Sequence, residues 1–70
     1  MNLTEIGRVQ KYLREKFDND QITLDTKGKT SDSVEVKLTD EFIGVCYRDD
    51  DEGEVSYAFH MAIIDLDLPE

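Results

Sequence analysis

The residues best suited to catalysis or metal binding lie in one stretch, from Asp40 to Ile64. It contains the only cysteine, Cys46, and the only histidine, His60. A thiol becomes a nucleophile when a base lies within hydrogen-bond reach, at about 3 Å. The strand pairing predicted below places the two residues about four positions apart along a ladder, or roughly 13 Å. We therefore expect no catalytic Cys–His pair, and no structural zinc site, which needs about four such ligands.

The same stretch carries a run of acids at a predicted turn. Its members are Asp49, Asp50, Asp51, Glu52 and Glu54. A calcium-binding EF-hand loop has acids at alternate positions and a glycine at the sixth. Counted from Asp49, the glycine Gly53 falls one place too early, so the pattern fails. Two alternatives are left: a weak divalent-ion site, or an exposed hairpin tip whose like charges oppose edge-to-edge aggregation.

General acid–base chemistry needs carboxylates in a pocket that shifts their pKa. Here the acids cluster at predicted turns and at the C-terminus, where water surrounds them. A single helix and four strands also leave little room for a pocket of several hundred Å³. The sequence therefore predicts no enzymatic activity, no cofactor and no metal.

The net charge of −9 is distributed unevenly. Residues 1–37 hold seven acids and seven bases, whereas residues 38–70 hold ten acids and a single base, Arg48. An acidic field of this kind repels nucleic acid and anionic membranes. This negative charge keeps the protein soluble, or it provides an acidic face for a basic protein partner.

Seventy residues predict one domain, 1–70. No run of about 18 apolar residues is present, and the N-terminus lacks the apolar core of a signal peptide. One cysteine cannot form an internal disulfide. These features predict a cytoplasmic protein.

A helix is predicted at about residues 3–17. Its apolar residues recur at steps of three or four and form one stripe: Leu3, Ile6, Val9, Leu13 and Phe17. Asn2 can cap the helix, with Glu5 completing a capping box. Four strands are predicted from apolar–polar alternation, at 21–27, 33–39, 42–48 and 54–62, followed by a C-terminal tail at 63–70. The fold class is α+β, an N-terminal helix packed on one face of a four-stranded antiparallel β-meander.

The segment Lys27 to Ser33 is predicted as a hairpin loop. Its Gly28-Lys29-Thr30 run matches a fragment of a phosphate-binding loop, but the upstream glycine and the following helix are missing. The next turn is predicted at Asp40-Glu41 or at Thr39-Asp40. The first choice places Val36 opposite Val45. The second slides the pairing by two residues and leaves the same faces matched.

In the acidic hairpin, the expected pairing puts Val45 opposite Tyr57 and Cys46 opposite Ser56. One face then joins the core, and the other carries small or weakly polar residues. The second face holds the candidate partner surface, Phe42, Gly44, Cys46, Ala58 and His60. A helix can cover only one face of the sheet, so either the tail 63–70 folds over this surface or another subunit packs there.

Several segments resemble a known family. They are YLREKF in the helix, DEFIGV at the second turn, YRDDDEGEVSY across the acidic hairpin and FHMAIID near the end. Together they resemble a family of small uncharacterised alphaproteobacterial proteins with a domain of unknown function, and DEFIGV and EGEVSYAFHMAI are the most specific. The resemblance implies a cytoplasmic bacterial protein and brings no catalytic or binding residues.

The sequence favours a non-enzymatic interaction protein that forms a homodimer or docks through a sheet face or edge, because so short a chain gains stability from association. The alternative is an acidic module that binds a basic protein or mimics nucleic acid. A weaker alternative is divalent-ion binding at the acidic turn.

Overall fold

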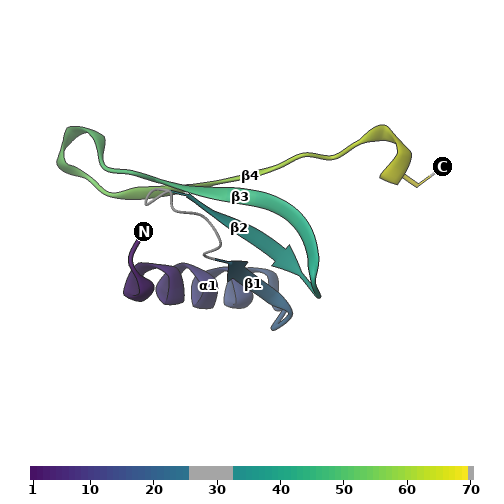
Figure 1. Cartoon of the computed structure of the whole chain (residues 1–70), viewed down its shortest axis with the longest axis horizontal. Coiled ribbons are helices and arrows are strands. Elements are labelled where there is room, and N and C mark those ends of the chain that lie inside the picture. Colours follow the sequence, from purple (N-terminus) through teal and green to yellow (C-terminus); the bar gives the residue numbers. More distant parts are fainter. Residues whose placement is uncertain (26–32, 70) are drawn as a thin grey trace.

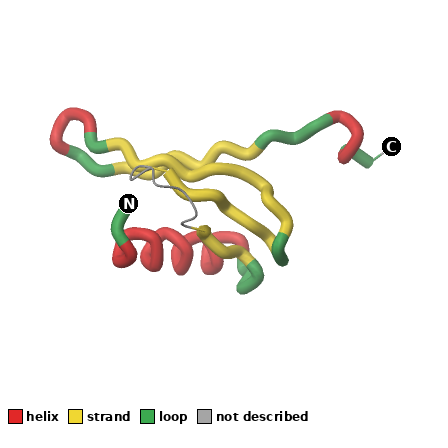
Figure 2. The backbone as a smooth tube through the Cα atoms, viewed as in Figure 1, coloured by secondary structure: helices red, strands yellow, loops and turns green. Residues whose placement is uncertain are grey.

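The computed structural model describes residues 1–25 and 33–69 and has the predicted α+β architecture (Figures 1 and 2). Its helix and strands are α1 (Leu3–Phe17), β1 (Ile22–Asp25), β2 (Ser33–Leu38), β3 (Glu41–Asp49) and β4 (Ser56–Met61). Single 3-10 turns cover Asp51–Gly53 and Asp65–Asp67. The predicted loop with its Gly28-Lys29-Thr30 run lies outside the described residues, except for Ser33, which begins β2.

Helix α1 begins and ends where its sequence predicts. The Asn2 side chain accepts a hydrogen bond from the Glu5 backbone at 2.8 Å, and the Glu5 side chain accepts one from the Asn2 backbone at 3.0 Å. This reciprocal pair satisfies two backbone donors that a helix start leaves open. At the other end, Asp18 adopts a left-handed conformation and its N–H closes the last turn. The apolar stripe then buries Ile6 and Leu13.

The sheet is an antiparallel meander in the order β1-β2-β3-β4, so β1 and β4 are its edges. Helix α1 lies against one face, called the inner face below, and is tied to β1 (Figure 2). Arg14 Nε donates to the Ile22 carbonyl at 2.7 Å, and Gln10 Oε1 accepts from the Leu24 N–H at 3.0 Å. These two bonds hold the helix towards the β1 edge.

Of the two predicted turns between β2 and β3, the second is confirmed, and the pairing of Val36 with Val45 that belongs to the first is wrong. The turn is Thr39-Asp40, with φ angles of 48° and 67°, which is the backbone of a type I′ hairpin turn. Lys37 pairs with Phe42, but Val36 pairs with Gly44, so Ile43 is an extra residue in the ladder. A one-residue bulge moves every later side chain of β3 to the other face.

The acidic hairpin also differs from its predicted register. The 3-10 turn at Asp51–Gly53 lengthens the connection, and β4 begins at Ser56. Cys46 therefore pairs with Phe59, and Val45 pairs with His60. The predicted pairs of Cys46 with Ser56 and of Val45 with Tyr57 are wrong for that reason.

The hydrophobic core is small. Its buried residues are Ile6, Leu13, Ile22, Leu24, Val34, Val36 and Cys46. Many large apolar residues stay exposed on the described part of the chain: Leu3, Tyr12, Phe17, Phe42, Tyr47, Val55, Tyr57, Met61, Ile63, Ile64, Leu66 and Leu68. Within the described ranges, no helix has the length and apolar character to cross a membrane.

Candidate functional site

The five residues of the predicted partner surface do not share a face. Gly44 is buried and Cys46 is only 1% exposed, both on the inner face beneath α1. Ala58 and His60 are exposed on the outer face, and Phe42 is exposed at the start of β3. The bulge at Ile43 and the longer acidic turn cause this separation, because each changes which strand residues point inward.

Cys46 and His60 point to opposite faces of the sheet. His60 pairs with Val45, the neighbour of Cys46, and neighbouring strand residues alternate in direction. The His60 ring lies edge-on to the Tyr47 ring, with centroids 5.3 Å apart. Burial raises the pKa of the Cys46 thiol, which disfavours the thiolate. The sheet itself separates this thiol from the imidazole.

The carboxylates of the acidic turn make local contacts. Asp50 accepts a hydrogen bond from Arg48 at 3.1 Å, and Asp49 Oδ1 accepts one from the Asp51 backbone at 3.0 Å. In the part of the chain that the structure describes, no three metal-ligating side chains converge on one point. The described geometry therefore provides no cage for a divalent ion at this turn.

Three side chains join the start of α1 to the acidic hairpin. Glu5 Oε2 accepts hydrogen bonds from Arg48 Nε at 2.7 Å and from the Tyr57 hydroxyl at 2.8 Å. The backbone bond from Asn2, then Tyr57 and Arg48, lower the pKa of Glu5 to about 2. The hydrogen bond to Glu5 raises the pKa of Tyr57 and that of Arg48. We call this group the Glu5 clamp.

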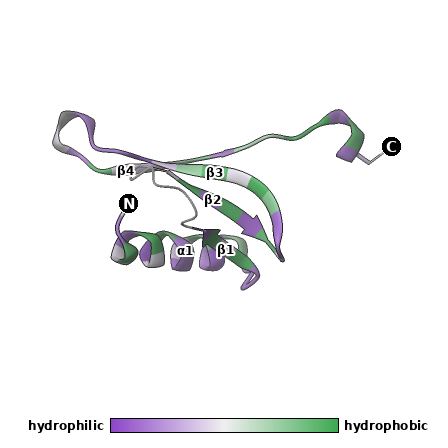
Figure 3. Ribbon diagram, in the orientation of Figure 1, coloured by the Kyte–Doolittle hydropathy of each residue, from purple (hydrophilic) through white to green (hydrophobic). Residues whose placement is uncertain are grey.

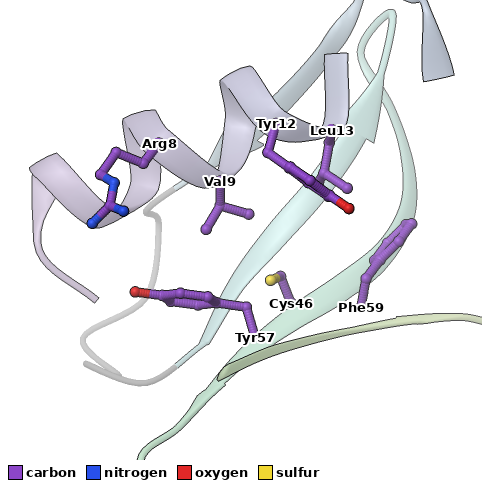
Figure 4. Close-up of a pocket in the computed structure, with 7 residues that line it drawn as sticks. All are labelled: Arg8, Val9, Tyr12, Leu13, Cys46, Tyr57 and Phe59. Atoms are coloured by element: carbon purple, nitrogen blue, oxygen red, sulfur yellow. The ribbon is translucent and has the colours of Figure 1, made fainter. Parts of the chain in front are cut away.

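An apolar hollow of about 390 Å³ lies next to the clamp, between α1 and the β3–β4 pair (Figure 4). Its lining residues are Arg8, Val9, Tyr12, Leu13, Cys46, Tyr57 and Phe59. Figure 4 shows Tyr12 extending from α1 and Tyr57 extending from the strands, with Arg8 at the end nearest the helix start. Ligand-binding hollows span about 300–1,000 Å³, so this space can accept a few apolar side chains. The expectation that the fold has little room for a hollow of this size is therefore wrong.

A second apolar hollow, of about 210 Å³, lies towards the end of α1. Its lining residues are Leu13, Phe17, Asn19, Ile22, Val36, Leu38, Ile43, Phe59 and Met61. Leu13 and Phe59 line both hollows. We call the two together the α1–β4 groove. It exists because α1 is held towards β1, which leaves the inner face of β4 only partly covered, with Phe59 packed against the core.

Comparison with known families gives one match. The model of the family described as "Protein of unknown function (DUF3126)" matches residues 5–67. The chain belongs to this family. The match spans the Glu5 clamp, both hollows and most of the C-terminal tail. Neither the curated proteins nor the solved structures gave a match.

The C-terminal tail, residues 62–69, leaves β4 and runs away from the helix (Figure 1). Its apolar residues are exposed: Ile63 by 67%, Ile64 by 56%, Leu66 by 92% and Leu68 by 52%. Backbone bonds from Asp67 to Ile64 and from Leu68 to Asp65 form its own 3-10 turn. The tail therefore has local structure, and each of these four apolar residues is more than half exposed in the described part of the chain.

Sequence reasoning missed the α1–β4 groove. It placed Tyr57 on the core-facing side of the hairpin together with Val45, and it gave no role to Tyr12. One signal was present: Tyr12 lies four residues after Arg8 and three after Val9, so these side chains border one side of the apolar stripe. An aromatic at the border of the stripe indicates that the apolar surface continues beyond the core.

Proposed function

We propose that the protein is a small cytoplasmic homodimer without catalytic activity of its own, in which strand β4 of one copy pairs with β4 of the other. The observation that carries the proposal is the partly covered inner face of β4, where Tyr57 and Met61 are exposed beside an apolar groove. A free, buried Cys46 fits a reducing compartment.

The imbalance between core and surface supports association. Seven apolar residues are buried, yet twelve large apolar side chains are exposed in the described ranges. A chain of this length seldom has a core that stabilises it well, and association is one of the usual remedies. A second copy that covers β4 removes part of this exposed surface from water, at about 25 cal/mol per Å² of apolar area.

The composition of β4 supports pairing at its edge. Proteins that keep an edge strand unpaired place lysine, proline or a bulge on it. The strand Ser56–Met61 reads SYAFHM, with no lysine, proline or glycine. Its ladder to β3 is regular over six residue pairs. Within the described residues, the outer edge of β4 thus has no partner strand and carries no Lys, Arg, Asp or Glu, so it can accept another strand.

Antiparallel pairing of two identical β4 strands has a defined consequence. The two-fold axis stands perpendicular to the sheet, so both helices lie on the same side of a continuous eight-stranded sheet. The two α1–β4 grooves then face each other across the axis. Tyr57, Phe59 and Met61 of both copies form the floor between the helices.

A charge on the β4 edge tests the proposal. Ala58 is exposed on the outer face, so Ala58→Lys leaves the monomer fold intact and places two cations near the two-fold axis. The control is Gln21→Lys, an exposed residue on the β1 side of the sheet. Sedimentation equilibrium should give wild type and Gln21→Lys twice the 8.1 kDa of one chain, and Ala58→Lys the monomer mass. A wild-type monomer at high concentration contradicts the proposal.

A second candidate function is binding of a basic partner by the acidic hairpin. Asp49, Asp50 and Asp51 are exposed at a tip that projects past the start of α1 (Figure 1). Such binding weakens strongly above physiological ionic strength, because screening shortens the reach of exposed charges. A variant with Asp49, Asp50 and Asp51 all changed to Asn should lose a bound basic protein, while its dimer mass stays unchanged.

A further inference from the structure

We infer that the α1–β4 groove of one copy binds the C-terminal tail of the other copy, so that the dimer exchanges tails. This inference rests on the proposed β4–β4 dimer and names what fills its grooves. Strand pairing alone covers little apolar area, because strand side chains point above and below the sheet and not towards its edge. A stable interface buries about 1,200–2,000 Å², and the tails supply the additional contact.

The tail has the chemistry that the groove accepts. Apolar residues and acids alternate along it in the order Ile63, Ile64, Asp65, Leu66, Asp67 and Leu68, which the colours of Figure 3 show. Leu66 protrudes from the 3-10 turn and is 92% exposed. Around the turn, Asp65 and Asp67 flank this leucine. The tail therefore presents an apolar side chain between two carboxylates.

The groove matches the tail in apolar character and in charge. Its larger hollow, of about 390 Å³, has an apolar floor of Cys46 and Phe59 and a cation, Arg8, at one end. Within the described residues, Arg8 makes no hydrogen bond or ion pair. Helix α1 as a whole carries four bases and two acids: Arg8, Lys11, Arg14 and Lys16 against Glu5 and Glu15. Among the described elements, α1 is the one in which basic residues outnumber acidic residues, and α1 borders the groove.

The direction of the chain favours the partner's tail over the chain's own. The start of β4 and the start of α1 lie at the same end of the molecule, because Tyr57 bonds Glu5. The tail leaves from the opposite end, next to Met61 (Figure 1). The tail therefore runs away from the larger hollow of its own chain. In the antiparallel dimer, the tail runs towards the end where the partner's β4 begins, and the partner's Arg8 hollow lies there.

Paramagnetic labelling of mixed dimers tests the inference directly. A nitroxide is attached through Pro69→Cys in the folded protein, where Cys46 is buried and protected from the reagent. The label then follows Leu68, and no residue of the groove is changed. The labelled chain is mixed with ¹⁵N-enriched wild type. We expect strong broadening of the Arg8, Val9 and Tyr12 amide signals of the enriched chain. A second sample, with label and ¹⁵N on the same chain diluted into excess unlabelled wild type, reports on binding in cis.

Each outcome decides between the alternatives. Broadening in the mixed sample alone supports tail exchange. Broadening in the diluted sample alone shows that the chain's own tail fills the groove and overturns the inference. No broadening in either sample, from a protein that still sediments as a dimer, overturns the inference and leaves the β4 dimer standing. A wild-type protein that sediments as a monomer contradicts both the tail exchange and the β4 dimer.

Charge reversal supplies an independent readout. Arg8→Glu should raise the dimer dissociation constant roughly tenfold, as should the double change Asp65→Lys, Asp67→Lys. Combining the three changes should restore affinity, because the charges of tail and groove are then exchanged. Lys11→Glu is the matched control, since Lys11 is exposed and does not line the groove. If combination fails to restore affinity while each protein stays folded, the proposed contact is wrong.

Discussion

Glu5 and Arg48 meet at 2.7 Å, although 43 residues separate them in the sequence. The contact joins the first turn of α1 to the last part of β3, beside the larger hollow. Gln10 and Arg14 hold the other side of the helix to β1. The helix is therefore fixed at both sides, and the width of the α1–β4 groove follows from these polar contacts and not from apolar packing across it.

The Glu5 clamp predicts a specific pH dependence. The pKa of Glu5 falls from its ordinary value of 4.5 to about 2 in the folded chain, chiefly through the Asn2 backbone bond. A carboxyl with a depressed pKa in the folded state contributes stability above its unfolded pKa and loses it as the pH falls. Wild type should therefore lose stability between about pH 4.5 and pH 2 more steeply than Glu5→Gln.

The measurement is urea unfolding of both proteins at several pH values across that window. The stability difference between wild type and Glu5→Gln should shrink as the pH falls, because protonated Glu5 and glutamine are similar. Glu15→Gln is the control, since Glu15 is an exposed acid of the same helix. A difference that stays constant from pH 6 to pH 2 would show that the clamp is not formed in solution.

Two glycines should respond in opposite directions to alanine. A Cβ at Gly44 meets the His60 carbonyl and the Phe59 ring, whereas a Cβ at Gly7 meets nothing within 4 Å. Gly44→Ala should destabilise by about 2 kcal/mol through overpacking. Gly7→Ala should stabilise by about 1 kcal/mol, because alanine costs less helix entropy. Thermal unfolding by circular dichroism measures both, and a harmless Gly44→Ala contradicts the β3–β4 register.

The β2–β3 turn holds Thr39 in an unfavourable conformation. Its φ of 48° lies in the left-handed region, where β-branched residues are outliers. Asparagine suits this position of a type I′ turn, so Thr39→Asn should stabilise by about 1 kcal/mol. Thr23→Asn, at an exposed position in β1, is the control and should be neutral or slightly destabilising. A destabilised Thr39→Asn variant would show that the turn does not have this geometry.

The sequence predicts the elements well and their faces poorly, for a physical reason. The capping box at Asn2 and the apolar stripe define α1 from local residues alone. Which side chains of β3 point to the inner face depends on a single extra residue, Ile43, in the ladder between β2 and β3. Strand side chains alternate with a period of two, so one bulge exchanges the inner and outer faces. Local apolar alternation fits either facing. Cys46 and His60 are expected on one face for a separate reason, the β3–β4 register. The longer acidic connection moves the partner of Cys46 from Ser56 to Phe59. His60 then pairs with Val45 and points to the other face.

The α1–β4 groove could not be predicted for a related reason. Its existence depends on where the helix sits across the sheet, and Gln10 and Arg14 fix that position through bonds to the β1 backbone. Polar residues on a helix rarely show in advance which backbone groups they will bind. The apolar tail was visible in the sequence, and its predicted role was to cover the second face of the sheet, with another subunit packed on that face as the alternative.

The most direct test of the β4 dimer is an isotope-filtered nuclear Overhauser measurement on a mixture of ¹³C,¹⁵N-labelled and unlabelled chains. The filter passes only contacts between different copies. The β4 dimer predicts Hα–Hα contacts within Ser56–Met61 across the two-fold axis, together with ring contacts between Tyr57 or Phe59 of one copy and inner-face residues of the other. Contacts confined to the outer face, around Phe42 and Tyr47, or no contacts between copies at millimolar concentration, would contradict it.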